Sequence, residues 1–162
     1  MKEWKKRTVD TCPLCDEHED SSHILLCQSD LATARWNLGL DEIEATLASI
    51  GTPKGTTTAI LSHLTHWRRD DGITPETETV TSTLQNELFM QQFIRWQAFM
   101  EGCLVKDWVA HASTFLPKQS SPRRWAQPLV TKLWLVAWDM WQLKPCFAQA
   151  RSIYLSAGTK QD

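Results

Sequence analysis

Residues 123–141 read RRWAQPLVTKLWLVAWDMW, and this stretch indicates the fold class of the whole chain. At helical spacing its side chains fall on an aliphatic face, an aromatic face and a narrow polar face: Leu129, Leu133, Val136 and Met140; Trp134, Trp138 and Trp141; Lys132, Asp139 and Gln142. A helix that is apolar around most of its circumference lies at the centre of a domain or in an interface. We expect its tryptophans to pack in the core, rather than to form a platform on which nucleic-acid bases stack.

The chain from residue 28 onward also has helical periodicity, and no strand-like alternation occurs in it. We expect a short helix over residues 29–37, a second helix that Asp41 caps and Gly51 stops, and then a loop over residues 51–58. The longest predicted helix covers residues 82–102. It places four large apolar side chains along one face: Phe89, Phe93, Trp96 and Met100.

Near the N-terminus, four metal-ligating side chains follow one another in the order Cys12-x2-Cys15-x7-His23-x3-Cys27. Two cysteines separated by two residues can share one tight turn, with both thiolates facing the same point. A Ser or Asp within residues 20–22 can cap a short helix, on which His23 and Cys27 project from one face because they are four residues apart. The two pairs then supply four ligands for a tetrahedral Zn²⁺ ion.

Four protein ligands fill the coordination sphere of zinc and leave no position for a catalytic water, so we expect a structural site. The sequence also contains no Gly-rich phosphate loop and no nucleophile elbow, and we expect that the protein is not an enzyme. Three alternatives stay open: His18 replaces His23 as a ligand, Cys12 and Cys15 form a redox pair, or the cysteines are ordinary thiols without metal.

We therefore predict an all-α fold, in which a helical domain carries a zinc knuckle at its N-terminus. The chain divides into a basic arm, the knuckle, a first helical segment, a linker or loop, a helical core and a divergent tail: residues 1–9, 10–28, 29–72, 73–82, 83–145 and 146–162.

A net charge of −2 argues against a protein built mainly to grip nucleic acid. The basic side chains of the arm are the exception: Lys2, Lys5, Lys6 and Arg7. This arm is either a solvated terminus or a weak, sequence-indifferent contact to RNA or DNA. Phosphate would be repelled by the knuckle, because the loop DEHED (residues 16–20) adds four carboxylates between the two ligand pairs.

The knuckle sequence CPLC…HILLC resembles the zinc-binding module that lies C-terminal to the reverse transcriptases of eukaryotic non-LTR-type retroelements. The stretches IRWQAFMEGCLVKDW (residues 94–108) and 123–141 are similar to the region that follows this module in such open reading frames. The resemblance implies Cys12, Cys15 and His23, together with Cys27, as zinc ligands, and an origin as a polymerase C-terminal fragment. The chain departs from the family after Trp141, where QLKPCF stands in place of the Arg-Asn that such sequences tend to have, and it contains no Tyr-x-Asp-Asp motif.

Two functions follow from these observations. The first is a non-catalytic zinc-binding module with weak nucleic-acid contact, as the resemblance implies. The second is a helical protein-interaction or structural domain, whose tryptophan-rich helix docks on a polymerase domain or on a second copy of the chain.

Two further expectations concern location and a second histidine pair. The first residues lack the apolar core of a signal peptide and no stretch is apolar enough to span a bilayer, so we expect a soluble, intracellular protein without membrane contact. His63 and His66 lack a third ligand nearby in the sequence, and we expect them to be partly exposed helix residues rather than a metal pair.

Overall fold

The structure of the chain is a computed structural model that describes residues 11–69, 82–118 and 120–158. Within these ranges the chain forms seven α-helices and no β-strand. The helices are α1 (His23–Leu26), α2 (Asp30–Ser49), α3 (Lys54–Arg69), α4 (Ser82–Ile94), α5 (Trp96–Met100), α6 (Lys106–Phe115) and α7 (Arg123–Gly158). The predicted all-α fold class is confirmed.

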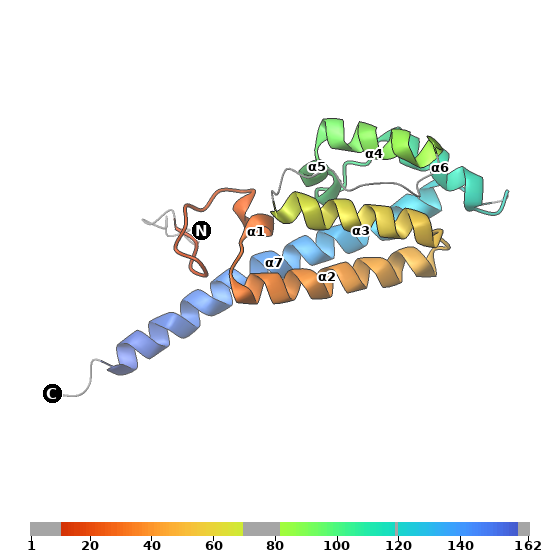
Figure 1. Cartoon of the computed structure of the whole chain (residues 1–162). Coiled ribbons are helices and arrows are strands. Elements are labelled where there is room, and N and C mark those ends of the chain that lie inside the picture. Colours follow the sequence, from red (N-terminus) through yellow and green to blue (C-terminus); the bar gives the residue numbers. More distant parts are fainter. Residues whose placement is uncertain (1–10, 70–81, 119, 159–162) are drawn as a thin grey trace, which may run out of the picture.

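Helix α7 is the central element of the fold. It pairs with α2 over a long contact, and it also packs against α1, α5 and α6 (Figure 1). Its aliphatic face is buried as predicted: Leu129, Leu133, Val136 and Met140. The helix continues beyond residue 145, where the sequence placed a boundary, and ends at Gly158 after passing the knuckle (Figure 1).

The aromatic face of α7 contradicts the sequence prediction. Trp125 is buried, and its indole N–H donates to the Thr52 hydroxyl at 2.8 Å. The indoles of Trp134, Trp138 and Trp141, however, are 59%, 55% and 39% exposed. The expectation that these three rings lie in the core was wrong, because α2 covers only one of the two apolar faces of α7.

Helix α2 is one continuous helix, where two separate helices were expected. Gly39 lies inside it and faces α7, and a Cβ atom on Gly39 would stand 2.6 Å from Cγ1 of Val136. The glycine therefore permits a close approach of two helices and does not break α2. The expected stop at Gly51 is confirmed, since its φ of +78° suits glycine. The expected loop 51–58 is shorter than predicted, because α3 already begins at Lys54, directly after Pro53.

The long helix expected over residues 82–102 is broken at Arg95, whose φ is +76°. The side chain of Gln91 is fully buried at this break and replaces lost backbone partners: its amide N–H₂ donates to the Arg95 and Cys103 carbonyls, and its oxygen accepts from the Val105 N–H and the Trp108 indole. The break divides the four side chains of the predicted apolar face between two environments. Trp96 and Met100 are buried, whereas Phe89 and Phe93 on α4 are exposed.

The contact between Gly39 and Val136 yields a prediction about stability. We expect Gly39→Ala to lower the free energy of unfolding by about 1–3 kcal/mol, because the added methyl group forces α2 and α7 apart despite the better helix propensity of alanine. Gly55→Ala is the matched control, since a Cβ atom at this helical position meets no atom within 4 Å. Chemical denaturation of both variants measures the difference, and equal effects would contradict the packing role of Gly39.

Candidate metal centre

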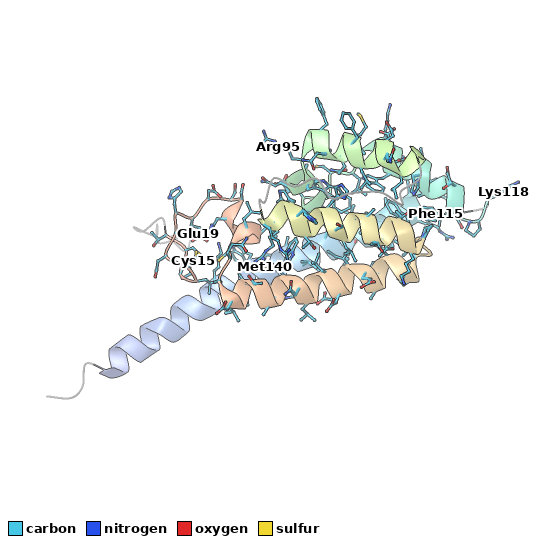
Figure 2. The ribbon with its side chains drawn as sticks, in the orientation of Figure 1. Cys15, Glu19, Arg95, Phe115, Lys118 and Met140 are labelled. Atoms are coloured by element: carbon cyan, nitrogen blue, oxygen red, sulfur yellow. The ribbon has the colours of Figure 1, made fainter. Side chains whose placement is uncertain are left out.

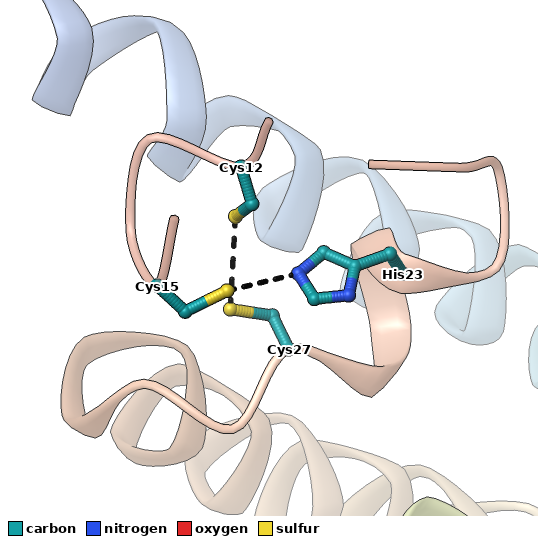
Figure 3. A group of neighbouring side chains, drawn as sticks. All are labelled: Cys12, Cys15, His23 and Cys27. Atoms are coloured by element: carbon teal, nitrogen blue, oxygen red, sulfur yellow. Dashed lines mark hydrogen bonds between the residues drawn. The ribbon is translucent and has the colours of Figure 1, made fainter. Parts of the chain in front are cut away.

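The four predicted ligand side chains converge on one point (Figure 3). The Sγ atoms of Cys12, Cys15 and Cys27 and the ring nitrogen of His23 all lie within 4.8 Å of one another. The Cys12 and Cys27 sulfurs are 3.9 Å apart, and the Cys15 sulfur is 3.1 Å from Nε2 of His23. Because a tetrahedral Zn–S bond of ~2.3 Å separates two ligand sulfurs by about 3.8 Å, this arrangement fits a zinc ion.

A tight backbone turn positions the first two ligands. The Asp16 N–H donates to the Cys12 carbonyl at 2.8 Å, and the Cys12 N–H donates to the Glu17 carbonyl at 2.7 Å. Asp16 adopts a φ of +61° at the point where the chain reverses. The turn therefore brings the Cys12 and Cys15 side chains to the same side of the chain, as their spacing predicts.

The other two ligands lie at the two ends of the short helix α1, of which His23 is the first residue and Cys27 follows the last. The start of this helix is capped by Asp20. Its Oδ1 atom accepts from the backbone N–H groups of Ser22 and His23, at 2.8 Å and 2.7 Å. These bonds lower the pKa of Asp20, the bond from His23 being the larger cause. Of the three capping residues that the sequence left open, Asp20 has this role, and it fixes the backbone of a ligand residue.

The structure distinguishes between the two candidate histidines. His23 presents Nε2 to the sulfurs, while its Nδ1 atom lies 4.0 Å from the Glu17 carboxylate. A carboxylate behind a ligating imidazole orients the ring. His18 is exposed, and its backbone pairs with Thr11 in an isolated β-bridge. His23 is thus the histidine of the cluster.

The crowding of three thiols shapes their ionisation. Burial, together with the contacts to Cys12 and Cys27, raises the pKa of the Cys15 thiol to about 12, although a hydrogen bond with the Glu17 backbone opposes the shift. At Cys27 burial also opposes ionisation, but hydrogen bonds from Ser29 and the contacts with the other two sulfurs outweigh it and lower the pKa. Three thiolates repel one another at this distance. A dication between them removes the repulsion, and it binds the thiolate form.

A buried cation connects the cluster to the helical body. The side chain of Arg68, on α3, is 5% exposed; it donates to the carbonyls of Leu25 and Cys27 at 3.0 Å and 2.5 Å. Its guanidinium also lies 5.4 Å from the ring centroid of Trp36 on α2. Burial lowers the pKa of Arg68, and the Cys27 thiolate opposes this effect. This role was not predictable from sequence patterns, since Arg68 is 41 residues from Cys27.

An ion pair and a hydrogen bond attach the knuckle to two further helices. The buried ammonium of Lys144, on α7, lies 2.7 Å from Glu19. The Ser22 hydroxyl donates to the side-chain oxygen of Gln97, on α5, at 3.3 Å. The knuckle is therefore held from three helices and is continuous with the body.

Three further sequence predictions concern the basic arm and the histidine pair on α3. The basic arm with Lys2, Lys5, Lys6 and Arg7 lies outside the described residues. His66 donates from Nδ1 to the Ser62 carbonyl, and His63 donates to that of Ala59, each at 2.8 Å. The expectation that His63 is partly exposed was wrong, because it is buried against Trp96; burial lowers its pKa.

A second polar cluster, which the sequence did not suggest, lies inside the body. The Thr56 hydroxyl is 3.1 Å from Nε2 of His111, and Nδ1 of His111 is 3.8 Å from a Glu87 oxygen. All three side chains are buried. They come from α3, α6 and α4; the hydrogen bond between Thr56 and His111 joins α3 to α6, while Nδ1 of His111 and Oε2 of Glu87 have no hydrogen-bond partner among the described residues.

Comparison of the chain with protein-family models, with curated proteins and with solved structures finds no match. Among the described helices, none is both long enough and apolar enough to cross a bilayer.

The position of Arg68 leads to a prediction that distinguishes its role from that of Arg69. We expect Arg68→Met to lower the free energy of unfolding by about 2–4 kcal/mol, because two buried carbonyls lose their donor. The apparent affinity for zinc should fall in the same variant, since the Cys27 backbone is no longer held. The matched control is Arg69→Met, which removes an exposed guanidinium from the same turn. Denaturation and competition with a zinc-binding dye measure both effects; a loss of stability with unchanged zinc affinity would show that Arg68 does not support the cluster.

Proposed function

We propose that the chain is a non-catalytic zinc-binding module in which zinc has a structural role. The observation that carries this proposal is the convergence of four soft and borderline ligand atoms, from Cys12, Cys15, His23 and Cys27, within 4.8 Å. Sulfur and imidazole ligands in this number favour zinc over magnesium or calcium, which prefer oxygen. A fourth protein ligand occupies the position that a catalytic zinc keeps for water.

Zinc at this site would supply binding energy for the local fold and no chemistry on a substrate. The segment from Thr11 to Gln28 is too short to form a core of its own, but Cys12, Leu25 and Cys27 belong to the buried core of the whole chain. The metal therefore fixes residues on which Arg68 and the neighbouring helices pack.

The relation to retroelement reverse transcriptases remains part of the proposal. It rests on the order and spacing of the ligands and on the resemblance of residues 94–108 and 123–141. Weak contact of the basic arm, residues 1–9, with RNA or DNA is part of the same proposal. About four neutralised phosphates would give a slope of log affinity against log salt near −3 to −4, so such contact would be largely lost at physiological salt.

The zinc assignment predicts the metal content of the purified protein. We expect about one zinc per chain, and we expect Cys15→Ser to lose it, because one of four ligands is removed. The far-ultraviolet helix signal should largely remain while the melting temperature falls, since the knuckle is part of the core. His18→Ala is the control and should keep the metal. Elemental analysis decides, and a full equivalent of zinc in Cys15→Ser would overturn the ligand set.

A second function, protein docking, is favoured by one observation. Trp134, Trp138 and Trp141 are exposed and line a groove of about 540 Å³, between α7, α5 and the knuckle. Large apolar side chains gathered at a solvent-exposed hollow mark an interaction site. We propose that this surface, named here the tryptophan groove, binds an apolar helical segment of a protein.

Binding measurements on the groove distinguish a protein partner from a nucleic acid. We expect a synthetic Leu/Lys amphipathic helix to quench or shift the tryptophan fluorescence, and Trp138→Ala to weaken this binding about tenfold or more, because an exposed aromatic anchor is lost. A poly(dT) oligonucleotide should cause no change that depends on Trp138, since Glu101 lines the groove and no basic residue does. Tight binding of the oligonucleotide that persists at high salt would instead show that the indoles stack on bases.

A further inference from the structure

The tryptophan groove has an apolar floor and one charged lining residue. Two of its indoles, Trp138 and Trp141, lie with ring centroids 4.9 Å apart, and the N–H of the third, Trp134, donates to the Glu101 carbonyl at 2.8 Å. The opposite walls come from Gln97 and Met100 on α5 with Glu101 directly after it, and from Ser21, Ile24 and Leu25 in the knuckle. The Glu101 carboxylate is exposed, and it is the only charged group among the residues that line this groove.

Helix α4 carries a second exposed apolar surface, which is convex. Phe89 and Phe93 are 68% and 79% exposed, more than the other large apolar side chains of the described residues, and Met90 and Ile94 stand beside them. We name these four side chains the α4 stripe. They repeat at i, i+1, i+4 and i+5, which is the spacing of one helical face.

The two surfaces complement each other in shape, and one pair of opposite charges lies at their edges. One is a hollow lined by aromatic side chains, and the other is a ridge of aromatic and aliphatic side chains on a helix, the combination found where a helix docks in a groove. The solvent-facing positions of α4 other than the stripe hold uncharged Gln85, Asn86 and Gln92. The first charge after them is the exposed Arg95, at the corner between α4 and α5 (Figure 2), opposite in sign to Glu101.

We propose that two copies of this chain associate by placing the α4 stripe of each copy in the tryptophan groove of the other. The inference rests on the second proposed function and names its partner. The stripe and one wall of the groove belong to consecutive helices, because α4 is followed directly by α5. Reciprocal use of both contacts about a two-fold axis gives a closed dimer, whereas a single contact repeated from copy to copy gives an open chain.

Reciprocal contacts bury the exposed aromatic side chains of both surfaces. They also bring Arg95 of each copy toward Glu101 of the other, at the rim, where opposite charges favour correct orientation more than affinity. One wall of the groove is the knuckle, so loss of the metal weakens the dimer as well as the monomer.

Sedimentation velocity and light scattering on the full chain with zinc test the proposal. The wild-type mass should rise with concentration from 18.6 kDa to twice that value. Trp138→Ala in the groove and Phe93→Ala on the stripe should each weaken dimerisation about tenfold or more. Both side chains are exposed, so neither change should disturb the fold. Leu38→Ala, at an exposed position of α2, is the control and should dimerise as wild type does.

Mixing the two variants makes the test specific to reciprocal docking. Each variant alone has both contacts damaged, whereas a mixed pair keeps one intact contact, formed by the groove of Phe93→Ala and the stripe of Trp138→Ala. Because the two losses in the mixed pair fall on one contact and overlap there, we expect the mixed pair to associate more tightly than the geometric mean of the two variants' self-association. A mixed pair no tighter than that mean would overturn the proposal in favour of groove-to-groove or stripe-to-stripe pairing.

A monomeric wild-type chain at all concentrations would also overturn it. If the Leu/Lys helix still binds the groove in that case, the docking function stands with a different partner. If neither the helix nor a second copy binds, both the inference and the docking function fail.

Discussion

The guanidinium of Arg68 is the interaction on which the arrangement of knuckle and body depends. A cation in the interior is tolerated only if its donors are satisfied, and here the carbonyls of Leu25 and Cys27 accept from it. The same side chain lies over Trp36, in the core of α2 and α3. If the knuckle left the body, the buried guanidinium of Arg68 would lose both carbonyl acceptors. Any metal bound by the four ligands would consequently be coupled to the packing of the helices, although it would touch only residues near the N-terminus.

The sequence predicted the metal centre better than any other part, for a physical reason. All four ligands lie within one short segment, so their spacing alone determines whether they can meet. The features that it missed depend on contacts between distant parts of the chain. The expected break between two helices near Gly39 was wrong because only the approach of Val136 explains a glycine inside α2, and the break at Arg95 was missed because local propensity does not encode the four hydrogen bonds of Gln91 that surround it.

The tryptophans of α7 show where periodicity stops being informative. A period of 3.6 residues sorts side chains into faces, and the aliphatic and aromatic faces of this helix were identified correctly. It does not tell which of two apolar faces the neighbouring helices will cover. That choice was made by shape, since the glycine of α2 brings its backbone against the branched aliphatic side chain of Val136 and leaves Trp134, Trp138 and Trp141 outside. Hydrophobicity alone would have favoured burial of the larger rings.

The central position of α7 has a consequence for the order of events during synthesis on the ribosome. The knuckle ligands emerge first and lie close in the chain, so they can capture a metal ion before the other helices exist. Helix α7 emerges last, yet α1, α2, α5 and α6 all pack against it. A metal ion captured at that stage would be held by a knuckle attached to an unfinished core, whose apolar faces stay open to chaperones until α7 closes them.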